Sequence, residues 1–360
     1  MFLAFKEIKR EKMRYGLIIL VIFLISYLIF MLSSLALGLA DENTQAIESW
    51  KAQKVVLNKN SNISMSQSVL TKTDLKNAKV GKKEAYVGLT PFVAKAKNRP
   101  SMSAQFLGID KDQFIYKDQE VVSGRKAKKN NEVTVDQAFE QKGYKLGDKI
   151  SLNDSKKKYK IVGFLKNAKI NIGPIVYGSM ATWKKLKVTM PNVQTSAIIS
   201  QNSNYKFNHK NAKTYDIKTV INKLPGHSAQ NMTFELMIGF LFVISLIIVA
   251  AFLYILTMQK LHNFAVMRAQ GIPSKTLVNA TISQSIILMA SGVIVALLAL
   301  WLTAVLLPAA VPMNFSPPIL VVGLVGMLLL GIIGRLIRGR SILTVCTAQH
   351  GLDSKLTYLE

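Results

Sequence analysis

Long apolar runs alternate with polar stretches along the chain in a pattern that is typical of membrane proteins. Residues 16–40 hold 25 positions without a charged side chain, and residues 236–258 and 277–307 are also mostly apolar. About 20 such residues are enough to cross a bilayer as a helix. A shorter, glycine-rich run follows at 319–334. The pattern therefore predicts four transmembrane helices.

The first apolar run has two interpretations. Its basic start and the sequence Gly38-Leu39-Ala40 resemble a signal peptide with a cleavage site. The apolar part of a signal peptide, however, spans about 7–15 residues, and this run is much longer. We favour a permanent membrane anchor. Residues 1–15 ahead of it are expected to form a cytoplasmic amphipathic helix on the membrane surface, or else a plain basic stop beside the span.

Basic residues flank the predicted helices unevenly. Residues 1–15 contain five Lys and Arg, 259–276 contain three and 335–360 contain four, whereas 308–318 contain none. Cytoplasmic flanks of transmembrane helices are enriched in Lys and Arg. Both termini and the 259–276 connection are therefore expected in the cytoplasm. The loop at 308–318 and the large segment at 41–235 are expected outside the cell.

The segment between the first and second helices is expected to fold as one large extracellular α+β domain. Four stretches rich in β-branched and aromatic residues predict strands, at 85–94, 103–109, 149–153 and 158–165. Two further stretches predict short helices, at 135–144, closed by Gly143, and at 179–186. Strands and helices are mixed along the segment, which indicates the α+β class.

Composition adds a strong positive charge to this picture. The chain has a net charge of +26, of which residues 41–235 carry +18. Such a charge can indicate a nucleic-acid-binding protein, but here most of it lies in a segment flanked by membrane spans, which excludes that class. Solvated charge is the simplest interpretation. Contact with anionic wall polymers or lipid headgroups is the functional one.

Sequence motifs for catalysis and metal binding are absent. The chain has no G-x-x-x-x-G-K-[ST] phosphate loop, no G-x-S-x-G and no H-E-x-x-H. A single cysteine, Cys346, excludes an intramolecular disulfide, and four scattered histidines argue against a local metal site. We therefore expect a chain that is not an enzyme. If it does energy-requiring work, another subunit must hydrolyse the ATP. No Asp, Glu, Lys or Arg lies well inside a predicted span, which argues against a proton-coupled transporter.

The stretch FAVMRAQGIPSKTL, residues 264–277, lies between the second and third predicted helices. It has an apolar-Arg-Ala-x-Gly core, in a chain with one span, an outer domain and then three spans. In both respects the chain resembles the FtsX/MacB-type permeases of ABC transporters, whose outer domain has a MacB-like core. The core residues are Met267, Arg268, Ala269, Gln270 and Gly271.

The resemblance implies that 264–277 is a coupling helix, which presses into a groove on a cytosolic ATPase. Phe264 and Met267 would fill the groove, and Arg268 would pair with acidic residues at its rim. Gly271 would end the helix with a positive φ, and Pro273 would prevent its continuation. An ordinary cytoplasmic loop is the alternative interpretation.

Within the family, the chain is most similar to haem exporter permeases of Gram-positive bacteria. That likeness implies a permease homodimer in the cell membrane, with two copies of a cytosolic ABC ATPase that binds the ATP. It also implies haem as the transported ligand, which enters sideways from the outer leaflet between the first two helices. No permanently bound cofactor is expected.

Candidate haem contacts can be named on both of these helices. Tyr27, Met31, Ser34 and Gly38 are spaced so that they share one face of the first helix. Tyr and Met both ligate haem iron, although simple packing also explains Met31 and Tyr27. Ser34 and Gly38 form a small-residue pair that suits packing of two first helices. The candidates near the outer end of the second helix are Met232, Glu235 and Met237.

Two other functions stay open within the same family. One is a non-transporting regulator that controls cell-wall hydrolases, as FtsX does, and the other is a peptide, lipoprotein or drug exporter. The tail also departs from the family pattern, because SILTV at 341–345 is followed by CTAQHGLDSKLTYLE without an Asp-Pro motif. Cys346 and His350 in this tail are therefore not interpreted as a metal site.

Overall fold

A computed structural model provides the structure of the chain. It describes residues 11–153, 155–187, 192–259, 266–267, 269–307, 311, 313–315, 321 and 325. The chain divides into two compact units, with boundaries at Leu37/Gly38 and at Asn231/Met232. We call the unit of residues 38–231 the α+β domain and the other the helical unit. Each is described by itself.

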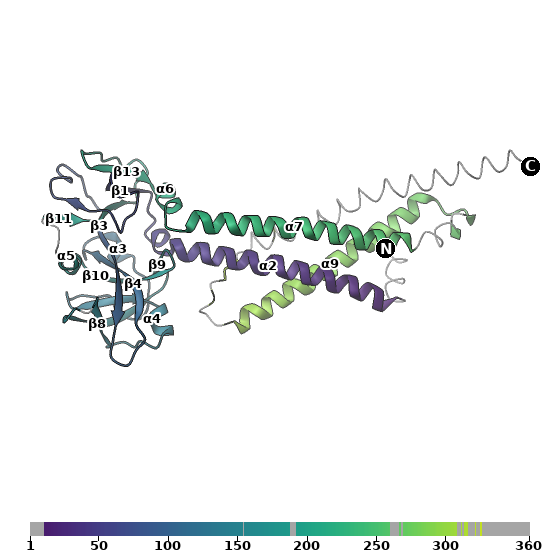
Figure 1. Ribbon diagram of the computed structural model, residues 1–360, viewed down its shortest axis with the longest axis horizontal. Helices are drawn as coiled ribbons and strands as arrows, with labels where there is room; N and C mark the ends of the chain where they lie inside the picture. Colours follow the sequence, from purple (N-terminus) through teal and green to yellow (C-terminus); the bar gives the residue numbers. More distant parts are fainter. Residues whose placement is uncertain are drawn as a thin grey trace, which may run out of the picture. The chain divides into compact units, whose positions relative to one another are not determined.

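Three long helices dominate the part of the chain outside the α+β domain: α2 (Lys12–Ser49), α7 (His227–Met258) and α9 (Ser274–Leu306) (Figure 1). Within the described residues, three segments are long and apolar enough to cross a membrane, at Lys12–Ser49, His227–Phe252 and Ser283–Leu306. They contain or overlap the first three predicted spans. The fourth, at 319–334, lies outside the described residues except for Val321 and Val325, and the 1–10 and 335–360 segments also lie outside them.

The three helices of the helical unit pack through two apolar clusters. The first joins Tyr15, Ile18 and Ile22 of α2 to Val249 of α7 and to Leu288 and Met289 of α9. The second joins Ile29 and Phe30 of α2 to Val293, Ala296 and Leu300 of α9. Between the clusters α2 approaches α9 at Gly292, where an added Cβ would lie 2.6 Å from Cγ2 of Ile22. A larger residue would push the two helices apart.

The α+β domain is built on a sheet of eleven strands in the order β13-β1-β12-β3-β4-β10-β6-β8-β5, with β7 and β9 paired beside this path and a separate β11-β2 pair. The strands are β1 (Lys54–Asn58), β2 (Leu70–Thr71), β3 (Glu84–Lys95), β4 (Met102–Ile109), β5 (Val121–Gly124), β6 (Glu132–Asp136), β7 (Lys149–Leu152), β8 (Lys158–Leu165), β9 (Lys169–Ile170), β10 (Gly173–Ser179), β11 (Val193–Thr195), β12 (Ala197–Ser200) and β13 (Ala212–Asp216). The short helices are α3 (Phe114–Lys117), α4 (Ala138–Gln141), α5 (Met180–Leu186) and α6 (Ile217–Asn222).

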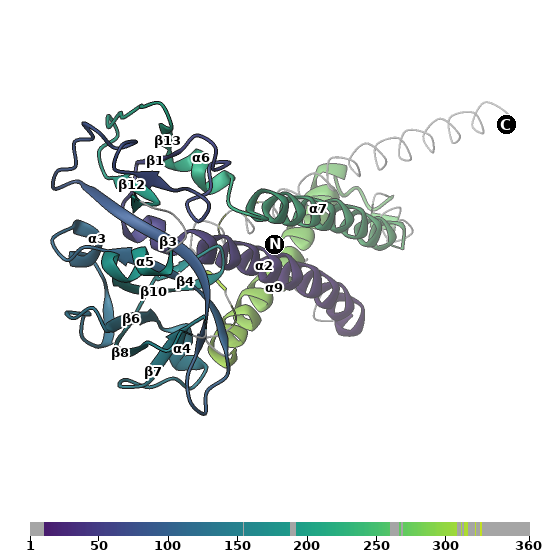
Figure 2. The ribbon, with the colours of Figure 1, turned by 60° about the vertical axis from the view of Figure 1, so that its left-hand side comes forward.

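Strand β3 belongs to two parts of this sheet (Figure 2). Its first residues pair with β12, and its later residues pair with β4 and β7. Because β7 also pairs with β8, the strands β3-β4-β10-β6-β8-β7 close into a ring. Alternate side chains point inward and fill the ring, and α5 contributes Trp183 to the same core. Each of the six strands in the ring therefore has a paired strand on both sides.

The four predicted strands are confirmed as β3, β4, β7 and β8. The predicted helix at 179–186 is confirmed as α5, whose N-cap Ser179 accepts a hydrogen bond from the backbone N–H of Thr182. The prediction of a helix over 135–144 is wrong at its start, because residues 135–136 belong to β6 and the helix covers only Ala138–Gln141. Gly143, with a φ of 85°, follows this helix as expected.

Candidate functional site

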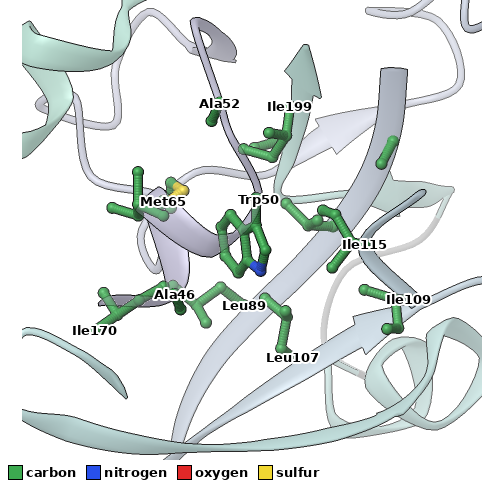
Figure 3. Packing of buried hydrophobic residues seen from close by; sticks show 14 of the residues in the cluster. Ala46, Trp50, Ala52, Met65, Leu89, Leu107, Ile109, Ile115, Ile170 and Ile199 are labelled. Atoms are coloured by element: carbon green, nitrogen blue, oxygen red, sulfur yellow. The ribbon is translucent and has the colours of Figure 1, made fainter. Parts of the chain in front are cut away.

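Helix α2 continues well beyond the predicted end of the first span at Ala40. Residues 41–49 are helical even though most are polar, and α2 ends at Ser49. Ala46, Ile47 and Trp50 are almost completely buried in the core of the α+β domain. Figure 3 shows Trp50 surrounded by aliphatic side chains from distant strands, among them Leu89, Leu107 and Ile199. The last turns of this long apolar helix are therefore part of the domain's hydrophobic core.

Polar contacts fix the same end of α2. The Lys169 ammonium forms an ion pair with the Glu42 carboxylate, and their side chains are only 19% and 14% exposed. The backbone N–H of Asn171 donates to the carbonyl of Asn43 at 3.0 Å. Partial burial makes such a pair stronger than an ion pair at the surface. The turn from β9 to β10 thus holds one face of α2.

Trp50 makes two hydrogen bonds with side chains that are remote in sequence. Its indole N–H donates to the hydroxyl oxygen of Tyr177 at 3.4 Å, and its carbonyl accepts from the side-chain amide of Gln201 at 3.0 Å. Burial raises the pKa of Tyr177, so that its hydroxyl is neutral. A buried aromatic side chain with its polar atom satisfied is a strong packing anchor.

A buried carboxylate lies close to this junction. Asp136 at the end of β6 is 3% exposed and accepts hydrogen bonds from the backbone N–H groups of Ala138 and Ala168. Burial raises the pKa of its carboxyl, and the nearby Lys169 ammonium opposes that rise. Lys169 therefore contributes to the electrostatic balance of Asp136 as well as to the ion pair with Glu42.

The candidate haem residues on α2 face the interior of the helical unit. The Tyr27 hydroxyl lies 2.9 Å from the Thr303 hydroxyl of α9, and Met31 packs beside it on the second apolar cluster. Ser34 is buried, and its carbonyl accepts a hydrogen bond from the backbone N–H of Asn314 at 3.0 Å. Tyr27 and Met31 thus share one face, as the spacing predicts, and that face packs in part against α9.

The candidates on α7 are in a different environment. Met232, Glu235 and Met237 are all exposed, with Met232 at 63% and Met237 at 41%. The neighbouring Phe240 is also 65% exposed. These side chains are free to meet a ligand, lipid or another copy of the chain, whereas Tyr27 already has a hydrogen-bond partner. The candidate residues on α2 and those on α7 therefore do not form one closed pocket in this structure.

The candidate coupling segment is described in part. Phe264 and Arg268 lie outside the described residues, whereas residues 266, 267 and 269 are helical. The helix ends as expected: Gly271 has a φ of 84°, the backbone N–H of Ile272 donates to the Met267 carbonyl at 3.1 Å, and α9 begins after Pro273. This hydrogen bond and the positive φ form a Schellman-type C-cap.

The described residues of this segment differ in exposure. Met267 is half-buried, whereas Val266 is 47% exposed and Ala269 and Gln270 are also exposed. Val266 and Gln270 are four residues apart and so share one helix face. The sequence interpretation missed Val266, although the same helical spacing places it beside Gln270. It also missed Thr303, Trp50 and Tyr177, whose partners are remote in sequence.

Comparisons with known proteins show which permeases the chain resembles. Residues 235–345 match the family described as FtsX-like permease C-terminal. A protein of Staphylococcus epidermidis is 27% identical over 92% of this chain and 93% of its own length. One of Staphylococcus haemolyticus is 27% identical over 95% and 97%. Both carry the provisional name hemin transport system permease protein HrtB.

Among solved structures, the periplasmic region of MacB from Actinobacillus actinomycetemcomitans aligns with 47% of this chain and 90% of its own, at 14% identity and a TM-score of 0.35. The family match and the relatives, rather than this distant likeness, carry the assignment. Together with the apolar helices, they establish a membrane protein with an α+β domain. Residues 235–345 thus match the family described as FtsX-like permease C-terminal, and the chain is similar over nearly its whole length to permease proteins named HrtB.

Proposed function

We propose that this chain is the permease subunit of an ATP-driven ABC efflux system that exports haem and relieves haem toxicity. The observation that carries the proposal is the similarity to proteins named for hemin transport, which extends over more than nine-tenths of the chain. The staphylococcal relatives favour the cell membrane of a Gram-positive bacterium. In the proposed topology both termini and residues 259–276 are cytoplasmic, and the α+β domain is extracellular.

The partner that supplies ATP hydrolysis is a cytosolic ATPase of the HrtA type, present in two copies beside a permease homodimer. The chain itself has no phosphate-binding loop. The coupling helix at 264–277 docks on the ATPase through the exposed face that includes Val266 and Gln270. Phe264 and Arg268 complete the contact, and Ser34 and Gly38 support packing between the two permease copies.

Movement of the coupling helix can reach the α+β domain through hydrogen bonds and packing. The coupling segment leads directly into α9, and α9 is tied to α2 by the Gln284 amide, which donates to the Tyr15 hydroxyl at 2.6 Å. The Tyr27–Thr303 hydrogen bond is a second tie between these helices. Helix α2 then enters the domain core at Trp50. In the proposed mechanism, closure of the ATPase shifts α2 and the domain and expels haem.

Haem enters between α2 and α7 and contacts residues of both helices. The exposed Glu235 carboxylate and the Met237 thioether on α7 are the accessible candidates for iron ligation, with Met232 beside them. On α2 the candidates are Tyr27, Met31 and Ser34. Because the Tyr27 hydroxyl bonds to Thr303, that hydrogen bond must change when Tyr27 ligates iron. Haem ligation by Tyr27 would thereby affect one of the hydrogen bonds that join α2 to α9.

A haem titration of the purified chain, followed by the Soret absorbance, tests the substrate. We expect saturable binding that Glu235→Gln or Met237→Ala weakens, while Met258→Ala leaves it unchanged. Met258 is a matched control because it is a similarly exposed methionine at the other end of α7, 46% exposed against 41% for Met237. Absence of saturable binding contradicts haem export and favours FtsX-like control of wall hydrolases. Saturable binding that neither variant weakens contradicts the proposed ligands.

A further inference from the structure

The turn between β9 and β10 has a strained backbone. Asn171 and Ile172 are its two central residues, because Ile170 and Gly173 on either side pair with each other. Both central residues have a positive φ, of 52° and 63°. A two-residue turn of this kind needs a positive φ at both positions and is usually formed by Asn followed by Gly. Asn171 fits this pattern, whereas a β-branched residue such as Ile172 is strained at a positive φ.

A second Asn-Ile pair in the same domain shows how burial can offset such strain. Asn62 and Ile63 also have a positive φ, of 48° and 59°. Ile63 packs against the apolar core that contains Trp50. Ile172 belongs to none of the apolar clusters in the described part of the chain, and its side chain is 44% exposed. Packing in the core therefore does not offset the strain at Ile172, and a strained residue that the core does not require suggests a function.

The turn is fixed beside the domain end of α2. The backbone N–H of Asn171 donates to the carbonyl of Asn43 at 3.0 Å. Immediately before the turn, the Lys169 ammonium forms its ion pair with the Glu42 carboxylate, which is the neighbour of Asn43 on α2. Ile172 follows directly after Asn171. The exposed side chain of Ile172 is therefore held close to the stretch of α2 around residues 42–43.

This stretch of α2 lies just beyond the apolar run that is long enough to cross a membrane. The run without charged residues ends at Ala40, and Asn43 is three residues further along the same helix. That separation is about 4.5 Å along the helix axis, whereas the headgroup layer on each side of a bilayer is about 5–7 Å deep. When α2 crosses the membrane, the turn therefore lies at the level of the headgroups. An exposed aliphatic side chain at this level is stabilised by contact with the acyl chains.

We propose that the β9–β10 turn is a lipid-contact site, at which Ile172 inserts into the boundary between headgroups and acyl chains of the outer leaflet. One aliphatic side chain contributes too little apolar area to bring a protein to a membrane. Because the turn is already attached to α2, the contact instead sets how the α+β domain rests on the lipid surface. The proposal requires α2 to span the membrane, but it does not depend on haem as the substrate. A haem titration without saturable binding leaves it unaffected.

The test uses the full chain in lipid nanodiscs with a nitroxide spin label on Ile172→Cys. Cys346, the single cysteine of the chain, is replaced by Ala so that no other position is labelled. Oxygen concentrates in lipid, whereas the nickel complex of ethylenediaminediacetate stays in water, so the collision rates of the label with each reagent report its surroundings. We expect the ratio of oxygen to nickel collisions to be severalfold higher at position 172 than at Ala181→Cys. Ala181 is the matched control because it is exposed and lies beyond the other end of β10.

Two results of this measurement would overturn the proposal. Equal ratios at positions 172 and 181 would show that the turn lies in water. Low collision rates with both reagents at position 172 would show that protein, such as a second copy of the chain, covers the turn instead of lipid. If Ile172→Cys does not fold, the unaltered chain is photolysed in nanodiscs whose lipids carry a diazirine near the glycerol end of the acyl chain. Mass spectrometry should then find lipid adducts at residues 171–173 and none at Ala181, and their absence from the turn would contradict the lipid contact.

Discussion

The hydroxyl oxygens of Tyr27 and Thr303 lie 2.9 Å apart, which joins α2 to α9 across 276 positions of the chain. Thr303 also donates to the carbonyl of Ala299 one turn earlier in α9, at 2.8 Å. Thr303 can therefore act as the acceptor for the Tyr27 hydroxyl. This hydrogen bond and the Tyr15–Gln284 bond occupy different levels of the same helix pair.

Replacing Tyr27 by Phe should weaken the α2–α9 contact only modestly. The change removes one hydrogen bond but leaves Thr303 bonded to Ala299, so that no buried polar group loses its last partner. We expect a loss of about 0.5–1.5 kcal/mol in the free energy of unfolding, measured by thermal or denaturant unfolding in detergent. Tyr254→Phe serves as the control because Tyr254 on α7 is 53% exposed. Equal losses in the two variants would contradict the role of the hydrogen bond.

Gly292→Ala should separate α2 from α9. The new Cβ would lie 2.6 Å from Cγ2 of Ile22 and 3.3 Å from the carbonyl oxygen of Ile19, so that backbone as well as side chain must move. Overpacking of this kind costs about 1–3 kcal/mol. Gly239→Ala is the control, since its Cβ would meet nothing within 4 Å.

A double-mutant cycle with Ile22→Ala can separate the clash from a general effect of alanine in the helix. The combined variant should lose less stability than the sum of the single losses, because the smaller side chain at position 22 makes room for the added Cβ. Strict additivity would exclude the close approach as the cause.

Trp50→Ala should destabilise the α+β domain strongly. The indole is 2% exposed within the domain core, and truncation of a buried aromatic side chain costs about 3–5 kcal/mol. Trp50→Phe removes the hydrogen bond to Tyr177 and part of the buried ring but keeps an aromatic side chain in the core, so its loss should be smaller than that of Trp50→Ala. Trp301→Ala, at a position 67% exposed on α9, is the control. Denaturant unfolding followed by circular dichroism measures all three. If Trp301→Ala lowers the free energy of unfolding as much as Trp50→Ala does, the result would contradict the role of Trp50 as a buried packing anchor.

Acid should weaken the ion pair between Arg125 and Glu132 and so lower the stability of the α+β domain. The hydrogen bonds from Arg125, Lys128 and Lys129 lower the pKa of Glu132 to about 2, from 4.5 in the unfolded chain. Because the folded-state pKa is the lower one, the stabilisation is complete above 4.5 and is lost as the pH falls towards about 2. The free energy of unfolding, measured over this pH range, should depend less on pH in Glu132→Gln than in the wild type. Glu140→Gln is the control, because Glu140 is exposed, and it should keep the pH dependence of the wild type. Identical profiles would contradict the assignment.

Local sequence patterns predicted those strands and helix ends that depend on residues close together in the chain. Strands β3 and β8 are rich in β-branched and aromatic residues, which favour strands. Gly271 has a positive φ, which ends the helix before it. The end of α2 could not be predicted in this way. Residues 41–45 are all polar and suggest that the helix stops, yet it continues to Ser49, and the contacts of its end include Tyr177, 127 positions away from Trp50.

The candidate sites show the same limit. Spacing correctly grouped Tyr27 and Met31 on one face, but it could not reveal that Thr303 already bonds to Tyr27. It named Met267 as a contact residue and did not consider Val266, because the exposure of each residue depends on how the neighbouring helices pack. The ring closed by β7 requires a pairing between β7 and both β3 and β8, which no local pattern encodes.

The most direct test of the proposed function is ATP hydrolysis by the chain reconstituted in nanodiscs with its ATPase partner, measured with and without haem. We predict that haem raises the rate, that Glu235→Gln removes only this stimulation, and that Val266→Asp lowers the basal rate as well, because a charge then enters the docking surface. A rate that ignores haem in the wild type and persists unchanged in both variants would contradict haem export driven through the coupling helix.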